Sequence, residues 1–395
     1  MGDSPAVGGL LLTINTGSSS VKIAGYRNEP TLPPLFRLAV DRIGQPGTVV
    51  HVTEPRENAV ENRSIPAQGH GSAILSALEY AHRTFAFRTD AVGHRVVHGG
   101  AAHAAPERVT ASLLADLRRL AVIDPSHMPR ALEAIDATTQ QYPEVPQVAC
   151  FDTAFHRTMP ELAQRYPLPS WTRTAGVCRY GFHGLSCEFI LSALAQLDPP
   201  AQRGRVLIAH LGNGASVTAM HDGASVDTTM GFSPTGGLMM GTRSGDLDPT
   251  ALTYLARTQH RDIETLEHVV DDESGLLGVS GISSDIRDLL RQPVSSSAVE
   301  AIELFCYIAR KHIGALAAVL DGIDTLVFTG GIGEHAPTIR ERICTGLGHL
   351  GVQLDRTHNA ANYDVISTPG STVVVRVIAT NEELMIARHV RAVLA

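Results

Sequence analysis

The sequence predicts an α/β protein built from two related domains. The chain has 395 residues, which is more than a single hydrophobic core usually organises. Short apolar runs typical of strands alternate with segments of helical periodicity, and this alternation indicates helices flanking mixed sheets. Two segments, Leu10–Tyr26 and Val206–Gly223, share one plan: an apolar run, a turn of small polar residues and a second, alternating run.

Each of these two segments predicts a β-hairpin. Their turns are rich in Gly, Asn and Ser, and such turns expose backbone N–H groups that can bind an anion. Two similar hairpins about 200 residues apart indicate a duplicated domain. If the turns face each other across a cleft, a phosphate chain can lie between them. The alternative is that both are ordinary hairpins without a ligand.

The remaining elements follow the same alternation. Helical spacing of apolar residues predicts helices, and short apolar runs predict buried strands. The predicted strands are Ala91–Val97, Gln147–Phe151, Leu326–Phe328 and Val373–Ala379. The predicted helices are Leu113–Leu120, Arg130–Thr139, Ser186–Leu197 and Val299–Leu320. Residues 28–70 are rich in Pro, Gly and charge, and we expect them to form a peripheral excursion of the first domain.

Composition narrows the class of protein. Apolar residues make up 44% of the chain and charged residues 18%, the balance of a globular protein, and the net charge of −8 argues against nucleic acid or a membrane surface as a partner. No apolar run reaches the roughly 18–20 residues needed to span a bilayer. The N-terminus lacks the basic region of a signal peptide. The five cysteines form no CxxC pair, so we expect reduced thiols in a cytoplasmic protein.

Only two lysines, Lys22 and Lys311, occur in the chain, and the other basic residues are arginines. Lys22 ends the polar turn Asn15–Lys22, whose hydroxyls, amide and ammonium group suit phosphate oxygens or a metal-bound water. The spacing is not that of a Walker A loop. The alternative for Lys22 is a solvated surface side chain.

Three further segments place Arg or His beside Gly near strand ends: Gly93–Gly100, Arg179–Gly184 and Met239–Asp246. Loops at strand ends are where α/β proteins place their sites, and glycine lets the backbone approach a ligand. Two arginines that converge would form a fork for a carboxylate or a phosphate. The alternatives are hydrogen-bonded structural histidines and arginines in surface ion pairs.

Two carboxylates also follow predicted strands. Asp152 can orient a nucleophile or hold an arginine, and helix capping is the alternative. Glu382 opens a predicted helix and can hold magnesium directly or through water, whereas an electrostatic role in the first helical turn is the alternative. Gly330–Glu334 follows a strand and resembles a loop under which a nucleoside can lie, although a plain tight turn fits equally well.

Nine segments in order resemble the acetate kinase family, which belongs to the superfamily of hexokinase, actin and the Hsp70 ATPase domain. They extend from about residue 10 to residue 390 and are INTGSSSVK, GHRVVHGG, FDTAFH, RYGFHG, HLGNGAS, MGFSPTGGLMMGTRSGDLDP, GISSDIRDL, FTGGIGE and TNEELMIARH. The resemblance implies duplicated domains with a nucleotide cleft between them. Residues 1–151 and 384–395 would form the N-terminal domain, and residues 152–383 the nucleotide-binding C-terminal domain.

The resemblance also implies an activity. The expected reaction is reversible, Mg²⁺-dependent transfer of the ATP γ-phosphoryl group to acetate, giving acetyl phosphate and ADP. Mn²⁺ can replace Mg²⁺, and a homodimer is expected. A kinase for propionate, butyrate or a more polar short acid is one alternative. A nucleotide-binding switch without acyl chemistry is another, but it would not need Arg95, Asp152, His183 and Arg243 together.

The resemblance assigns roles to individual positions of this chain. The implied catalytic residues are Arg95, His127, Asp152, His183 and Arg243. The implied phosphate- and acyl-binding residues are Ser18, Ser20, Lys22, Val97, Ser126, Phe182 and Pro234. The implied nucleotide-binding residues are His210, Leu211, Gly212, Asn213, Gly214, Asp285, Ile286, Arg287, Gly330, Gly331, Ile332 and Gly333. The implied magnesium-associated residues are Asn15 and Glu382.

The chain departs from the family pattern in two places. The family commonly has A-P-L-H-N-P where this chain has Asp124–Pro129, so Ser126 replaces a Leu of the acyl pocket and the preferred acid stays open. The family's H-G-T-S-H is present as His183–Cys187, in which the second His is lost. We expect this second change to alter local support and to leave the chemistry intact.

Overall fold

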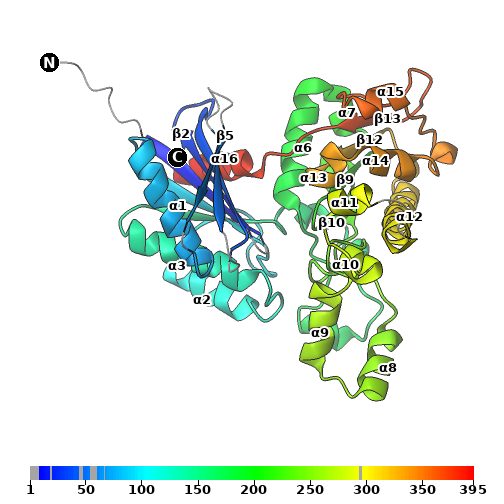
Figure 1. Ribbon diagram of the computed structural model, residues 1–395, viewed down its shortest axis with the longest axis horizontal. Helices are drawn as coiled ribbons and strands as arrows, with labels where there is room; N and C mark the ends of the chain where they lie inside the picture. The colour runs from blue at the N-terminus through cyan, green and yellow to red at the C-terminus, as the bar shows by residue number, and fades with distance from the viewer. Residues whose placement is uncertain (1–8, 18–19, 44–47, 54–59, 66, 293–295) are drawn as a thin grey trace. The chain divides into compact units, whose positions relative to one another are not determined.

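The computed structural model describes residues 9–17, 20–43, 48–53, 60–65, 67–292 and 296–395, and the chain forms two compact units (Figure 1). Unit 1 comprises Met1–Ala154 and Asn381–Ala395, and unit 2 comprises Phe155–Thr380. The boundaries expected from the sequence, 151/152 and 383/384, differ from this division by a few residues. In the observed division, Asp152 and Glu382 belong to unit 1.

Unit 1 contains a mixed sheet of eight strands in the order β5-β4-β3-β2-β1-β6-β8-β7. The strands are β1 (Gly9–Thr16), β2 (Ser20–Arg27), β3 (Pro34–Asp41), β4 (Val49–Thr53), β5 (Val60–Ser64), β6 (Arg88–Val96), β7 (Glu107–Arg108) and β8 (Gln147–Phe151). β1, β6 and β8 run parallel, and the other neighbouring pairs are antiparallel. The segment expected to be peripheral supplies β3, β4 and β5, so it extends one edge of the sheet.

Helices cover both faces of this sheet. They are α1 (His70–Thr84), α2 (Ala111–Leu120), α3 (Met128–Gln141) and α16 (Glu382–Leu394). At Gly93 in β6, a Cβ atom would lie 2.4 Å from Ile386 of α16, so only glycine fits beneath this helix. Neighbouring His94 contacts Thr138 of α3, with Nε2 3.3 Å from its hydroxyl. Because successive strand residues point to opposite faces, α16 and α3 pack on opposite sides of the sheet.

Unit 2 contains a five-stranded sheet in the order β11-β10-β9-β12-β13. Its strands are β9 (Val206–Leu211), β10 (Ala215–His221), β11 (Ala224–Thr228), β12 (Thr325–Thr329) and β13 (Val374–Val377). β9, β10 and β11 form an antiparallel meander, and β12 runs parallel to both β9 and β13.

The two sheets repeat one topology. The order β3-β2-β1-β6-β8 in unit 1 corresponds to β11-β10-β9-β12-β13 in unit 2, with an antiparallel meander followed by parallel strands in both. Both predicted hairpins are confirmed, as β1–β2 and β9–β10. The predicted α/β architecture with duplicated domains is therefore confirmed.

Unit 2 also contains the larger number of described helices. They are η1 (Phe155–Thr158), α4 (Glu161–Gln164), α5 (Ser170–Thr174), α6 (Gly184–Leu197), α7 (Pro199–Arg203), α8 (Pro249–Gln259), α9 (Ile263–Asp272), α10 (Gly275–Ser280), α11 (Ile286–Arg291), α12 (Ser296–Val319), α13 (Gly330–His335), α14 (Pro337–Cys344), η2 (Gly348–Leu350) and α15 (Arg356–Ala360). The predicted helices overlap α2, α3, α6 and α12. The loop expected at Gly330–Glu334 is instead helical, because α13 begins directly at the end of β12.

Cys187, which stands where the family commonly has a histidine, lies in the core of unit 2. Cys187, Ile190 and Leu194 of α6 pack in one buried cluster with Val206 and Ile208 of β9. Cys187 has no exposed surface, so it acts as a small apolar core residue.

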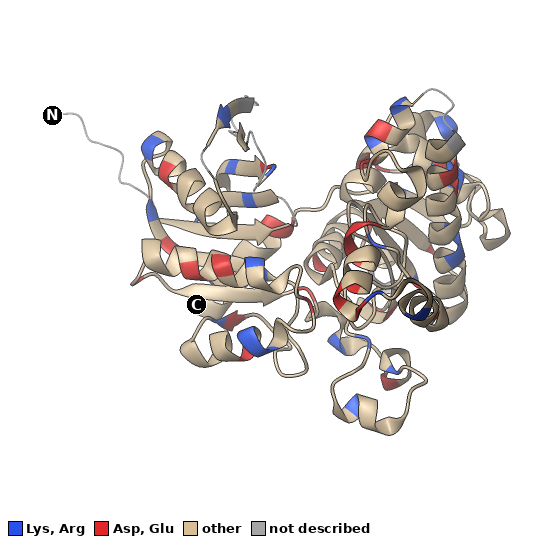
Figure 2. Ribbon diagram, turned by 60° about the horizontal axis from the view of Figure 1, so that its bottom comes forward, with Lys and Arg blue, Asp and Glu red and all other residues tan. Residues whose placement is uncertain are grey.

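Charged residues are interspersed over the described elements of both units (Figure 2). None of the helices in the described part of the chain combines the length and apolar composition that crossing a bilayer requires.

His156 of η1 supports the backbone that leads to His183. Its Nε2–H donates to the Phe182 carbonyl oxygen at 2.9 Å, and its Nδ1 lies 2.9 Å from Ser225 Oγ. Burial lowers the pKa of His156 to about 4, although its hydrogen bond to Phe182 acts in the opposite direction. The folded chain therefore holds this ring neutral at pH values where an exposed histidine is protonated.

This burial predicts acid lability. An unfolded histidine binds a proton below about pH 6.5, whereas folded His156 does so only near pH 4. Stability should therefore fall as the pH drops from 6.5 to 4. Between pH 7 and 4.5, the free energy of unfolding of the wild type should fall by about 2–3 kcal/mol more than that of His156→Gln. Urea unfolding checks this, with exposed His221→Gln as the control. Equal losses in the wild type and His156→Gln would contradict it.

Candidate active site

Four of the residues predicted from the sequence come together in unit 1. Asn15 lies near the end of β1, Arg95 near the end of β6, Asp152 directly after β8, and Glu382 is the first residue of α16. Because β1, β6 and β8 are parallel, their carboxyl ends meet at one edge of the sheet, the usual location of sites in α/β proteins.

A hydrogen-bond network joins these four side chains. Arg95 donates from Nη2 and Nε to Asp152 Oδ2 at 2.6 and 2.9 Å, and from Nη1 to Asn15 Oδ1 at 3.2 Å. Asn15 Nδ2 donates to Glu382 Oε2 at 2.8 Å and to Glu383 Oε1 at 3.2 Å. Burial by itself would lower the pKa of Arg95, but the charges of Asp152 and Glu382 outweigh it and raise the pKa. The guanidinium is thus a permanent and fixed cation.

The Glu382 carboxylate and the Asn15 amide oxygen fit a magnesium ion that also binds phosphates. Carboxylate and amide oxygens are suitable Mg²⁺ ligands, and this ion commonly uses one or two carboxylates together with waters and substrate phosphates. In the described parts of the chain, no three His, Cys, Asp or Glu side chains form a metal-binding group. Glu382 and Asn15 offer one carboxylate and one amide oxygen, so a Mg²⁺ ion held by them would take its remaining ligands from substrate phosphates and waters.

Other predicted residues of unit 1 lie on the same strands or beside them. Ser20 begins β2, and Lys22 is exposed in β2 opposite Asn15. Val97 is buried directly after β6. Ser18 lies outside the described residues.

The segment that departs from the family pattern begins α3. Ser126 is half-buried. His127 Nδ1 lies 2.9 Å from Asp124 Oδ1, and the His127 backbone N–H donates to the same oxygen at 3.1 Å. Asp124, where the family commonly has Ala, therefore holds the His127 ring in one orientation.

Unit 2 brings together a second set of predicted residues. His183 occupies the N-cap position of α6 in the left-handed backbone region (φ 58°), and His210 lies near the end of β9. Their rings stack with centroids 4.2 Å apart. A Cβ atom at Gly214 would lie 2.8 Å from Arg243 Nη2 and 3.2 Å from His183 Nε2. Glycine at this position therefore lets the two side chains approach the β9–β10 turn.

One predicted nucleotide-binding segment, Gly330–Gly333, lies against the same turn. A Cβ atom at Gly212 would lie 4.0 Å from the Gly331 nitrogen, and one at Gly330 would lie 2.8 Å from the Leu211 carbonyl oxygen. The start of α13 therefore lies against the end of β9. The Asn213 carbonyl oxygen accepts a hydrogen bond from Gly241 of the arginine-bearing loop.

The other predicted residues of unit 2 lie in its loops and in the first turns of α11 and α13. Arg243 Nη1 donates to the Pro234 carbonyl oxygen at 2.7 Å. Asp285 caps α11 by accepting from the Arg287 nitrogen at 2.8 Å, and the side-chain hydrogen bond with Arg287 is the main cause of its lowered pKa. Ile286 and Phe182 are buried, and Ile332 and Gly333 lie within α13.

Some residues of these networks were not predicted from the sequence. Glu383 contacts Asn15, Ser216 contacts His183, and Ser186 contacts His210. Glu383 and Ser216 lie inside the quoted motifs and Ser186 lies in the His183–Cys187 segment, but the partners of all three are distant in sequence. Sequence reasoning could have flagged the motifs and could not have paired these residues.

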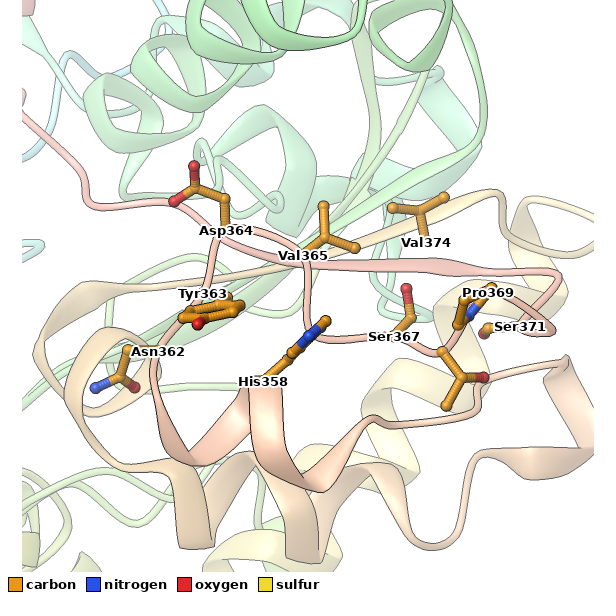
Figure 3. Close-up of a pocket in the computed structure, with 10 residues that line it drawn as sticks. His358, Asn362, Tyr363, Asp364, Val365, Ser367, Pro369, Ser371 and Val374 are labelled. Carbon is orange, nitrogen blue, oxygen red and sulfur yellow. The ribbon is translucent and has the colours of Figure 1, made fainter.

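A separate open pocket of about 740 Å³ lies in unit 2 around α15 and β13 (Figure 3). Its lining includes His358, Tyr363, Asp364 and Ser367, and the rings of His358 and Tyr363 lie 4.8 Å apart. No residue predicted for catalysis or binding belongs to the described lining, so the pocket is distinct from the candidate site.

Comparisons with known proteins identify the family of this chain. The model of the acetokinase family matches residues 10–388. An acetate kinase of Rhodopseudomonas palustris is 45% identical over 390 residues, which cover 96% of this chain and 97% of that protein. An acetate kinase of Heliobacterium modesticaldum is 42% identical, covering 96% and 98%.

Solved structures give the same result. Acetate kinase from Porphyromonas gingivalis matches with a TM-score of 0.86 and 35% identity, covering 98% of this chain and 100% of that one. A propionate kinase from Francisella tularensis matches with a TM-score of 0.90 and 34% identity, covering 97% and 99%. Because the family model and the similar proteins cover nearly its whole length, the chain belongs to the acetokinase family.

Proposed function

We propose that the protein is an acetate kinase, which transfers the γ-phosphoryl group of ATP to acetate and gives acetyl phosphate and ADP in a reversible reaction. The observation that carries the proposal is one immobilised arginine in each unit. Arg95 is held by Asp152, and Arg243 is held by the Pro234 carbonyl oxygen. A reaction between a carboxylate and a phosphate chain needs fixed positive charges, because its two reactants repel each other.

The chemistry requires positioning more than proton transfer. Acetate is already ionised near neutral pH, so it needs no general base. Asp152 then serves to hold Arg95. The transition state of phosphoryl transfer spreads negative charge over the equatorial oxygens, and the catalytic groups Arg95, Arg243, His183 and His127 would stabilise that charge. We propose that residues of both units act on the same ATP and acetate.

The remaining residues complete the substrate sites in this proposal. The nucleotide would bind unit 2, with the β9–β10 turn near the phosphates, Asp285–Arg287 on the adenine side, and Gly331 and Ile332 at the start of α13 opposite them. Ser18, Ser20 and Lys22 would contact phosphate oxygens. The acyl group would lie against Val97, Phe182 and Pro234. Each of these assignments follows the family motif position by position.

The divalent cation of the proposal is Mg²⁺, with Mn²⁺ as a substitute. When bound, it would neutralise phosphate charge. Glu382, directly or through water, and Asn15 would hold it, and their contact with Arg95 and Asp152 would fix their orientation. We also propose a cytoplasmic homodimer, on the basis of the family resemblance.

A second acid is favoured by one observation. Ser126 is half-buried where the family commonly has Leu, and one similar solved structure is a propionate kinase. Serine supplies less apolar wall than leucine, so space for an additional methylene is expected. We propose that acetate and propionate are both accepted.

Loss of either fixed arginine should abolish most activity. Arg95→Ala and Arg243→Ala should each reduce kcat/KM by about 100- to 1000-fold, because one preorganised charge in such a site is worth about 3–4 kcal/mol. An acyl hydroxamate assay with ATP and acetate measures this, and circular dichroism checks folding. Exposed arginines provide matched controls, Arg118→Ala in unit 1 and Arg165→Ala in unit 2. Folded variants with normal activity would refute the assignment.

Removal of the Glu382 carboxylate should change the metal dependence. Glu382→Gln keeps the size of the side chain and loses its charge, so we expect a lower kcat and a higher Mg²⁺ concentration for half-maximal activity. Titration of activity with Mg²⁺ measures both, and exposed Glu79→Gln is the control. An unchanged Mg²⁺ dependence would favour a role for Glu382 in the helix terminus alone.

Restoring leucine at position 126 should narrow the choice of acid. In Ser126→Leu, the ratio of kcat/KM for propionate to that for acetate should fall several-fold, because one methylene in an apolar pocket is worth about 1 kcal/mol. Kinetics with acetate, propionate and butyrate measure this ratio, and Ser112→Leu on the exposed side of α2 is the control. If the ratio stays constant, Ser126 does not line the acyl site.

A further inference from the structure

Two buried serine hydroxyls contact the stacked histidines of unit 2. Ser216 Oγ lies 2.9 Å from His183 Nδ1, and Ser186 Oγ lies 2.8 Å from His210 Nδ1. Both serines have 0% exposed surface. Within the described part of the chain, the histidine nitrogen is the only hydrogen-bond partner of each hydroxyl.

The direction of each hydrogen bond follows from this burial. A hydroxyl that only accepted from Nδ1 would leave its own O–H buried without an acceptor, which folded proteins avoid. Each serine therefore donates to Nδ1. A neutral imidazole whose Nδ1 accepts carries its proton on Nε2. His183 and His210 therefore each carry a proton on Nε2 that can be donated in a hydrogen bond.

Both Nε2 atoms lie beside the β9–β10 turn. His183 Nε2 is 3.2 Å from a Cβ position at Gly214, next to Arg243 Nη2, and His210 Nε2 is 3.8 Å from a Cβ position at Gly212. A neutral N–H donor here adds hydrogen bonding without placing a second positive charge beside Arg243. The stacked rings, 4.2 Å apart, also avoid the repulsion of two imidazolium ions.

We propose that Ser186 and Ser216 are positioning residues for phosphoryl transfer: they hold His210 and His183 as a pair of neutral Nε2–H donors directed at phosphate oxygens. This inference rests on the proposed kinase function. His127 offers a contrast. Its Nδ1 contacts the Asp124 carboxylate, which can only accept when ionised, so that Nδ1 carries a proton. Serine hydroxyls therefore leave Nδ1 of His183 and His210 without a proton, whereas a carboxylate keeps a proton on Nδ1 of His127.

Nuclear magnetic resonance tests the tautomers directly. In full-length protein with ¹⁵N-labelled histidine, long-range proton–nitrogen correlations distinguish a bare Nδ1 from a protonated one. We expect a bare Nδ1 for both rings in the wild type, assigned by comparison with His183→Gln and His210→Gln. Ser216→Ala and Ser186→Ala should each shift the contacting ring towards a mixture of tautomers. Protonated Nδ1 atoms in the wild type would overturn the proposal, even if no serine variant folded.

Kinetics test whether the tautomers matter for the reaction. Ser216→Ala and Ser186→Ala should lower kcat by about 10- to 100-fold, the range seen for residues that orient metal-bound histidines, with little change in KM for acetate. Ser216→Thr and Ser186→Thr keep the hydroxyl, so both variants should retain the wild-type kcat and the wild-type tautomer.

Thr218→Val is the matched control for these variants. Thr218 lies two residues along β10 from Ser216, is equally buried, and contacts Thr228 and Cys187 through its hydroxyl. A loss of kcat as large as in Ser216→Ala would overturn the proposal, as would an altered tautomer with unchanged kcat. A wild type without kinase activity would refute the proposed function, whereas the spectra would still decide the tautomers.

Discussion

The ion pair between Arg95 and Asp152 is the interaction on which the candidate site in unit 1 depends. Asp152 is fully buried and accepts two hydrogen bonds from the guanidinium. Removing either partner would leave a buried charge uncompensated, at a cost of about 3–5 kcal/mol. Arg95 also contacts Asn15, and Asn15 contacts Glu382, so one ion pair orients four side chains. Because buried ion pairs are weak evidence for net stabilisation, we attribute to this pair a role in positioning.

In unit 2, close packing of backbone segments positions Arg243, as the ion pair positions Arg95 in unit 1. A Cβ atom at Gly214 would lie 2.8 Å from Arg243 Nη2, and one at Gly241 would overlap Asn213. Glycine at these positions allows the β9–β10 turn and the arginine-bearing loop to pack together, and the hydrogen bond from the Gly241 nitrogen to the Asn213 carbonyl oxygen joins them. Backbone packing therefore determines where Arg243 lies, whereas a side-chain ion pair determines where Arg95 lies.

The repeated topology explains why two such different clusters occupy similar places. β1 corresponds to β9 in the strand order, and these strands carry Asn15 and His210 near their ends. β6 corresponds to β12: the first carries Arg95, and the second leads directly into α13 at Gly330. Duplication thus supplied equivalent positions at the ends of equivalent strands, and the residue types at those positions differ between the units.

The sequence by itself determined the architecture and the motifs, because alternation of apolar residues and glycine-rich turns are local signals. Leu10–Tyr26 and Val206–Gly223 could be identified as hairpins in this way, and the ordered motifs identified the family. The start of α13 was mistaken for a loop, because three glycines in four residues weaken the helical signal. Only the tertiary structure decided which side chains meet. Ser216 and His183 are far apart in the chain, and their contact depends on the packing of α6 against the sheet, which no local pattern encodes.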